Sequence, residues 1–149
     1  MNYDVLKLKN QLCFPLYAAA KEIVGNYKPF LDTIDLTYTQ YITMMVLWEQ
    51  KHIRVKELGE YLYLDSGTLT PLLKRLESKG FVSRERSTDD ERIVTVFITE
   101  AGEQLKEQAA NMPMQISGCL PLTQEEAVTL YKLLYKILTP HNPTDTENP

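Results

Sequence analysis

The feature that most constrains the fold of this chain is the segment IRVKELGEYLYLDSGTLTPLLKRLESKG, residues 53–80. Its second half carries four leucines at the i, i+3, i+4, i+7 spacing of a helix that packs one face against a core: Leu69, Leu72, Leu73 and Leu76. A tight break at 63–65 separates this helix from a shorter one before it. Asp65 or Ser66 can cap the N-terminus of the second helix, and Gly80 ends it. The segment therefore predicts a helix-turn-helix.

The residues after Gly80 predict a β-hairpin. The segments FVSRERS (81–87) and VTVFIT (94–99) are rich in β-branched residues and partly alternate, and the polar stretch TDDER (88–92) lies between them. A helix-turn-helix followed directly by a hairpin with a charged tip is a winged helix-turn-helix, whose second helix fits the major groove of DNA. The chain is therefore expected to have a mainly α fold with a small β-hairpin wing (α+β).

The segment before this motif predicts a long helix. From Asp4 to Tyr27, apolar residues recur at intervals of three and four. Pro15 lies inside the pattern and removes one backbone donor, so we expect a kink or a late start there. The Lys28-Pro29 pair is expected to carry the chain out of the helix and into a connecting segment.

Capping signals mark the starts of the other helices. Two pairs have the spacing of a capping box: Thr37 with Gln40, and Thr123 with Glu126. The first pair opens a helix that is apolar on most of its surface and is expected to be buried, with Tyr41, Met44, Met45, Leu47 and Trp48. The second pair opens the last helix, 125–138. Between them, a helix begins after Thr99 and ends before Pro113, and ISGCLPLT (116–123) connects it to the last helix as a flexible segment.

The charge of the chain is unevenly distributed. The net charge is −4, yet residues 51–92 hold nine basic and eight acidic residues, against seven and twelve elsewhere. A DNA-binding protein needs a positive surface only where it meets DNA, so the acidic total does not exclude one. No apolar run approaches the ~20 residues of a membrane helix, and the first residues lack a signal core. Two cysteines far apart fit neither a disulfide scaffold nor a zinc site. We expect a cytoplasmic protein without a metal or cofactor.

Hydroxyl and basic side chains gather on the surfaces that this fold turns toward DNA. Five lie on the second helix of the motif, away from its leucines: Ser66, Thr68, Thr70, Lys74 and Arg75. The hydroxyls can reach phosphates and base edges, and the two cations would neutralise phosphates. Arg84 and Arg86 lie on the first strand of the hairpin. Arg92 lies at the tip, where a lone arginine can enter the narrow minor groove. Each feature alone is common on protein surfaces, but their succession favours DNA binding.

These residues also carry a family resemblance. The stretch YLYLDSGTLTPLLKRLESKGFVSRERSTDDERIVTVFITEAG resembles the DNA-binding core of MarR-type regulators, and Asp90, Glu91 and Arg92 match their Asp-x-Arg wing motif. LDSGTLTPLLKRLE and QLCFPLYAAAKEI resemble the organic-hydroperoxide-sensing (OhrR-like) subfamily and the related staphylococcal SarZ regulators. The resemblance extends to about Thr139. It implies a homodimer in which the first and last helices of each subunit interlock.

The resemblance divides the chain by role. It implies one domain, residues 1–139, followed by a polar tail at 140–149 that is expected to be disordered. Within the domain, residues 51–98 form the DNA-binding part. Residues 4–36 and 100–139 form the dimerisation part.

The resemblance also gives Cys13 a role. On residues alone, Cys13 is a small buried hydrophobe, the commonest state of a free cysteine. In the subfamily, tyrosine hydroxyls, some from the partner subunit, hydrogen-bond a reactive cysteine, and Tyr27 and Tyr38 match those positions. Cys119 either resolves oxidised Cys13 of the other subunit or is idle, in which case a small cellular thiol serves. Pro15 departs from the family pattern and puts the reactivity of Cys13 in doubt.

The sequence thus predicts a dimeric repressor that leaves operator DNA when an organic hydroperoxide oxidises Cys13. One alternative is a repressor of the same fold released by a small apolar or phenolic ligand. A second is a thiol peroxidase, and a third is a helical interaction protein without DNA. No membrane partner is expected.

Overall fold

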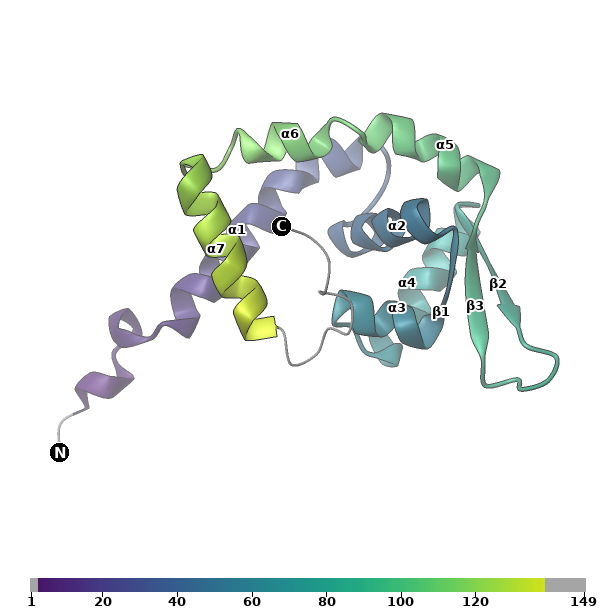
Figure 1. Cartoon of the computed structure of the whole chain (residues 1–149), viewed down its shortest axis with the longest axis horizontal. Helices are drawn as coiled ribbons and strands as arrows, with labels where there is room; N and C mark the ends of the chain where they lie inside the picture. Colours follow the sequence, from purple (N-terminus) through teal and green to yellow (C-terminus); the bar gives the residue numbers. More distant parts are fainter. Residues whose placement is uncertain (1–2, 139–149) are drawn as a thin grey trace.

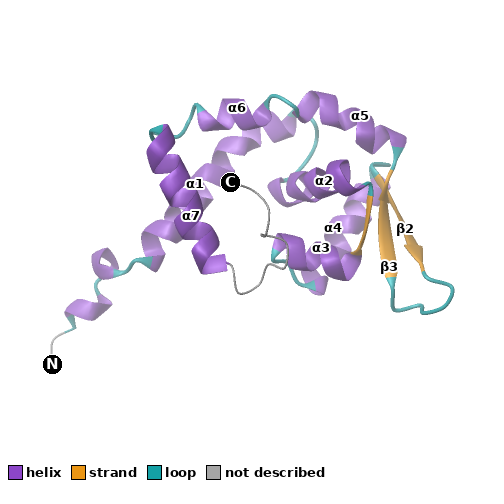
Figure 2. Ribbon diagram, viewed as in Figure 1, coloured by secondary structure: helices purple, strands orange, loops and turns teal. Residues whose placement is uncertain are grey.

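The computed structural model describes residues 3–138 and has the predicted fold class, with helices around a small sheet (Figures 1 and 2). Two 3-10 turns, Asp4–Leu6 and Leu8–Asn10, precede the first helix. The elements that follow are α1 (Cys13–Asp32), α2 (Tyr38–Gln50), β1 (His52–Arg54), α3 (Val55–Leu62), α4 (Ser66–Ser78), β2 (Val82–Arg86), β3 (Val94–Ile98), α5 (Glu100–Ala109), α6 (Met112–Ser117) and α7 (Gln124–Leu138).

The helix-turn-helix forms as predicted. Tyr63 ends α3 in the left-handed conformation (φ 54°), which turns the chain sharply toward α4. The Asp65 side chain caps α4 by accepting a hydrogen bond from the Thr68 amide at 2.8 Å. All four leucines of the stripe are buried, and Gly80 ends the segment at φ +78°. Local signals were sufficient here because each end of α4 is fixed by neighbouring residues.

The wing is one strand larger than predicted. β2 and β3 form the expected antiparallel hairpin, with Val82 opposite Ile98. A third strand, β1, pairs with the other edge of β3 and brings Ile53 opposite Val96. The prediction of two strands was therefore incomplete. β1 is only three residues long, so its alternation of one buried side chain between two exposed ones is too short to be recognised as a strand in the sequence.

The core lies between α2, the helix-turn-helix and the sheet. Five apolar side chains are completely buried there, from α2, α3, α4 and β3: Met44, Leu47, Leu58, Leu76 and Val96. The predicted capping box of Thr37 and Gln40 is present at the start of α2. The Trp48 indole donates a hydrogen bond to the Gly102 carbonyl at 2.8 Å, tying α2 to α5. Met45 differs from the prediction, because 44% of it is exposed. We call the part from α2 to α5, residues 38–109, the head.

The first helix is shifted along the sequence relative to the prediction. It begins at Cys13, so the expected late start is confirmed, and Pro15 lies in its first turn, where a missing backbone donor costs little. The helix does not end near Tyr27 but continues past Pro29 to Asp32. Its last turn is held by the burial of Leu31 against the core, which offsets the hydrogen bond that Pro29 removes.

The chain after α5 also differs from the prediction. Pro113 does not start a loop but lies in the first turn of the short helix α6, whose Met112 and Ile116 are buried. The predicted capping box before α7 is present: the Thr123 amide donates to Glu126 Oε2 at 2.8 Å, and the Glu126 amide to Thr123 Oγ1. α1 and α7, which we call the arm, lie on the side of α2 opposite the wing (Figure 1).

Two of the sequence expectations concern the ends and the surroundings of the chain. The polar tail, 140–149, lies outside the described residues. No helix within residues 3–138 is long and apolar enough to cross a membrane.

Candidate nucleic-acid interface and redox site

The predicted reading face of α4 is exposed. Its five predicted DNA-binding side chains are all on the surface: Ser66, Thr68, Thr70, Lys74 and Arg75. The Thr70 hydroxyl donates to the Ser66 carbonyl at 2.8 Å, which fixes the rotamer of Thr70. Lys74 and Arg75 make no ion pair within residues 3–138, so both charges face solvent. This arrangement suits a helix that lies in the major groove.

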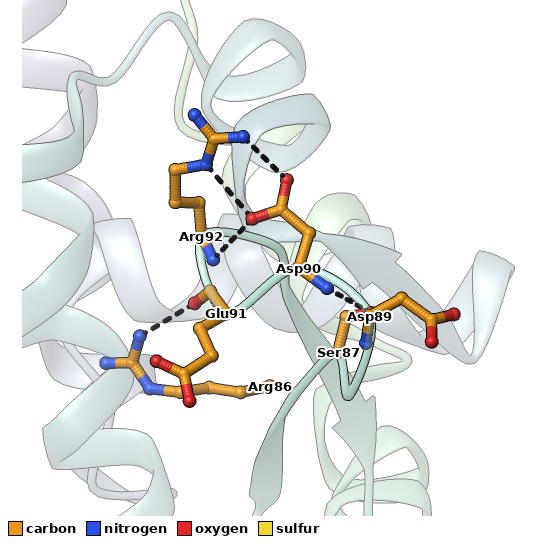
Figure 3. A network of polar contacts seen from close by, with 6 residues as sticks. All are labelled: Arg86, Ser87, Asp89, Asp90, Glu91 and Arg92. Carbon is orange, nitrogen blue, oxygen red and sulfur yellow. Dashed lines mark hydrogen bonds and ion pairs between the residues drawn. The ribbon is translucent and has the colours of Figure 1, made fainter.

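The tip of the wing is held by a network of polar contacts (Figure 3). Arg92 donates from Nε to Asp90 Oδ1 at 3.0 Å and from Nη2 to Asp90 Oδ2 at 3.1 Å. Hydrogen bonds from Arg92 lower the pKa of Asp90. Arg86 donates to the Glu91 carbonyl at 3.0 Å, and the Ser87 hydroxyl accepts from the amides of Asp89 and Asp90. The side chain of Arg92 remains 90% exposed, so the network presents its guanidinium at the end of the hairpin.

Arg84 has a different environment from the other predicted DNA-binding arginines. Its guanidinium donates two hydrogen bonds to Glu77 Oε2 on α4, at 2.7 and 3.1 Å, and its amide donates to Oε1. The hydrogen bond from Arg84 lowers the pKa of Glu77, so this carboxylate is charged at neutral pH. In the free protein, Arg84 therefore fastens the hairpin to α4.

A groove of about 1010 Å³ runs between α3, α4 and the wing. Its lining includes Ser66 and Thr70 of the reading face and five basic residues: Arg54, Lys56, Arg84, Arg86 and Arg92. Arg54 and Lys56 were not predicted as DNA-binding residues, although both lie in the basic stretch 51–92. Both precede the reading helix in the sequence, and only the fold brings them into the groove that α4 and the wing line.

The two cysteines are both free and exposed. Cys13 is the first residue of α1, so the prediction from residues alone, a buried hydrophobe, is wrong. Cys119 follows α6 and donates its thiol hydrogen to the Gln115 carbonyl at 3.3 Å. Both sulfur atoms are accessible to an oxidant.

The predicted tyrosines form an aromatic cluster where α1 meets α2. The rings of Tyr27 and Tyr38 are 5.0 Å apart, and Tyr41 lies 5.8 Å from Tyr27. Burial raises the pKa of all three, and neighbouring tyrosines raise it further for Tyr27 and Tyr41. The hydroxyls therefore stay protonated at neutral pH and can donate hydrogen bonds to an anionic sulfur.

One chain does not bring Cys13 and these tyrosines together. Cys13 and Tyr27 lie on the same helix. At 1.5 Å per residue, positions 13 and 27 are about 21 Å apart along its axis. Because Tyr38 is beside Tyr27, it is also far from Cys13. A site made from all three residues needs a second chain.

The arm leaves large apolar surfaces uncovered. In α7 no residue is buried, and in α1 only Leu31 is. The exposed apolar residues of these two helices are Phe14, Leu16, Tyr17, Val24, Val128, Leu130, Tyr131, Leu133 and Ile137. Continuous apolar patches of this kind mark surfaces that bind another protein.

The fold and the reading face define a winged-helix regulator, and comparisons with known proteins identify its family. The family described as transcriptional regulator SarA/Rot matches residues 26–109. The chain is 48% identical to the organic hydroperoxide resistance transcriptional regulator of Bacillus subtilis, covering 91% of this chain and 92% of that protein. It is 40% identical to the regulator SarZ of Staphylococcus saprophyticus, covering 90% and 92%.

The fold leads to the same group. The structure of reduced AbfR bound to DNA, a protein of Staphylococcus epidermidis, matches with a TM-score of 0.74 and 36% identity, covering 90% of this chain and 93% of that one. The chain belongs to the MarR/SarA family of transcriptional regulators, as its sequence motifs predicted. It is therefore a regulator and not an enzyme, which removes the thiol peroxidase alternative.

Proposed function

We propose that the protein is a homodimeric repressor that binds operator DNA while Cys13 is reduced and releases it when an organic hydroperoxide oxidises Cys13. The observation that carries the proposal is the separation of Cys13 from Tyr27 and Tyr38 in one chain, in an arm whose apolar surface is uncovered. A second copy would place its own Tyr27 and Tyr38 near Cys13 and would cover the apolar surface of the arm.

The geometry of α1 suits such a pairing. Positions 13 and 27 are equally distant from position 20. A two-fold axis that crosses α1 near Ala20 would therefore set Cys13 of one copy opposite Tyr27 of the other. Residues 18–20 are all alanine, so two helices can approach closely there. The exposed leucines of α7 would then cover the crossing. Two-fold pairing also supplies the two reading helices that a palindromic operator needs.

The proposed chemistry starts with the Cys13 thiolate. The sulfur attacks the outer oxygen of the hydroperoxide, the O–O bond breaks, and the alkoxide leaves with a proton as the alcohol. Cys13 becomes a sulfenic acid, oxidised by two electrons. A second thiol can then attack this sulfur to form a disulfide, and the sulfenic oxygen leaves as water. That thiol is Cys119 of the partner or a small cellular thiol.

Relatives support a redox switch of this kind. AbfR has been solved on DNA in reduced and overoxidised forms, and separately in a disulfide form. Because the overoxidised form was solved on DNA, oxygen on sulfur alone does not prevent DNA binding in that protein. This favours disulfide formation as the step that releases DNA here. Cys119 is a candidate for the resolving thiol because it is free and exposed.

A physical route leads from the sensing residues to DNA. Tyr38 begins α2, and the connection just before it contacts the end of the reading helix. There, Lys79 Nζ lies 3.0 Å from Asp35 Oδ2 and also donates to the Asp35 carbonyl. Movement of the tyrosines would shift this connection and α4 together. The two reading helices would then no longer match major grooves roughly 34 Å apart.

Operator binding by fluorescence anisotropy tests the proposal, with a duplex from the upstream region of the protein's own gene. Wild type, Cys13→Ser and Cys119→Ser are measured before and after one equivalent of cumene hydroperoxide. We expect wild type to release the duplex and Cys13→Ser to stay bound. Release by Cys13→Ser would overturn the sensing role of Cys13. Cys119→Ser should release only when a small thiol is added.

One observation favours the alternative of a small-molecule effector. A groove of about 380 Å³ lies between α2 and α5, lined by Tyr41, Met45 and Trp48, with Lys106 at its edge. An aromatic acid could place its ring against these side chains and its carboxylate near Lys106. Release of Cys13→Ser from DNA by such a compound, without peroxide, would favour this function.

A further inference from the structure

The basic residues around the DNA-binding groove differ in whether their charge is already paired. Arg84 is neutralised by Glu77, and Arg92 by Asp90, each through two hydrogen bonds. Arg86 donates to a carbonyl, which carries no net charge. By contrast, the side chains of Arg54 and Lys56 make no hydrogen bond or ion pair within residues 3–138. Of these five side chains, only those of Arg54 and Lys56 make no polar contact among the described residues, and we call these two residues unpaired.

Both unpaired residues are exposed and fixed at their backbone. Arg54 ends β1 opposite Thr95 of β3, and Lys56 lies in the first turn of α3. The sheet and the helix thus hold the two positions on the side of the groove that faces α4 and the hairpin. Two carboxylates, Glu60 and Asp65, also line the groove, and Asp65 is engaged in capping α4. The groove still has an excess of positive charge.

The position of the groove indicates what occupies it. One wall carries the reading face of α4, which suits the major groove, and the other carries the hairpin with Arg92 at its tip, which suits the adjacent minor groove. A DNA strand that separates these two grooves must pass between the walls. Its phosphates are the anions that this groove would meet.

We infer that Arg54 and Lys56 bind the phosphates of the DNA strand that passes between α4 and the wing. This inference rests on the DNA binding in the proposed function but not on its redox switch. The two residues supply affinity without sequence preference, because a phosphate is the same at every base pair. Arg84 supplies much less, since its charge is compensated by Glu77 and its side chain is only 24% exposed, against 90% for Arg92.

The salt dependence of binding tests this directly. Each phosphate contact contributes about 0.9 to the slope of log affinity against log salt concentration, so a substitution present in both subunits should reduce the slope by about 1.8. We expect this for Arg54→Gln and for Lys56→Gln, and about twice as much for the double variant. Affinity should fall by the same factor on the operator duplex and on a scrambled duplex of equal length. All measurements use the reduced, full-length protein.

Two further variants make the result specific. Arg54→Lys keeps the charge and should retain the wild-type slope. Lys9→Gln removes the same charge from the 3-10 turn Leu8–Asn10, outside the head, and should leave the slope unchanged. Thermal melts check that each variant is folded. We expect this because the substituted side chains are exposed.

Three outcomes would overturn the inference. The first is an identical slope in wild type and in Arg54→Gln/Lys56→Gln. The second is a loss of affinity confined to the operator duplex, which would mean base recognition. The third is an equal reduction of the slope by Lys9→Gln, which would mean a general charge effect. None of these depends on peroxide. A wild type that binds both duplexes but ignores peroxide would instead refute the redox switch and leave the phosphate contacts standing.

Discussion

The head and the arm of this protein bury their apolar side chains to very different extents. In the head, Met44, Leu47, Leu58, Leu76 and Val96 are completely buried between helices and sheet. In the arm, α7 has no buried residue, and only the end of α1, which touches the head, has one. The head thus has a core of its own, whereas the apolar side chains of the arm lack a second surface to cover them.

This difference assigns DNA recognition to the head and a sensing role to the arm. A closed core holds the reading face of α4 and the wing in a fixed relation, so the capacity to recognise DNA resides in a single head. The arm depends on what covers it. A sensing device built there can alter how two heads are placed without disturbing the fold of either.

The largest expected effect comes from replacing a leucine by alanine in each region and comparing the loss of stability. Leu76→Ala in the head should lower the free energy of unfolding by about 2–5 kcal/mol at every protein concentration, because it leaves a cavity in a closed core. Leu133→Ala in the arm should lower stability only as far as the dimer contributes, so its effect should vary with concentration. Chemical denaturation at two protein concentrations, together with light scattering, measures both. A concentration-independent loss for Leu133→Ala would mean that the arm is covered within one chain.

A smaller effect is expected for the affinity of the head for operator DNA. Arg92→Ala should weaken operator binding by about 1–3 kcal/mol, because it removes the group that the tip presents to the minor groove. Oligomeric state and response to peroxide should remain as in wild type, since neither depends on the wing. Anisotropy titration and light scattering provide the two readouts. Unchanged affinity would remove the wing tip from DNA recognition.

The smallest expected effect concerns pH and the fastening of the wing. Arg84 lowers the pKa of Glu77 in the folded state below its ordinary value of 4.5. A lowered folded-state pKa contributes stability above 4.5, and this contribution disappears as the pH falls through the folded-state pKa. The pair is partly exposed, so its contribution is about 0.2–1 kcal/mol. Wild type should melt above Glu77→Gln at pH 7, and the difference should shrink as the pH falls below 4.5 and vanish once Glu77 is protonated in the folded state. Glu85→Gln, which removes an exposed carboxylate, should show no such convergence.

How far the sequence predicted the fold depended on whether the determining contacts were local. The leucine stripe of α4, its Asp65 cap and the capping boxes at Thr37 and Thr123 were all predicted, because their partners lie within a few residues. β1 was missed, and so was the continuation of α1 past Pro29, because Val96 and the core that receives Leu31 lie far along the chain.

The candidate sites divide in the same way. The sequence identified the exposed face of α4 and Arg92 at the tip from periodicity and from the hairpin signal. It also selected Cys13, Tyr27 and Tyr38 through resemblance, but not their separation within one chain, which follows from α1 being a single continuous helix.

The sequence thus identified the family through the resemblance of its motifs. Short-range periodicity and capping fixed the helix-turn-helix and the residues that α4 exposes. Only the tertiary structure decided which charges are free to meet DNA. Pairing of Arg84 with Glu77, and the gathering of Arg54 and Lys56 beside the wing, depend on packing β1, α3, α4 and the hairpin around one core. The sequence shows which residues are charged, but whether a charge is compensated depends on which side chains the fold brings within hydrogen-bonding distance.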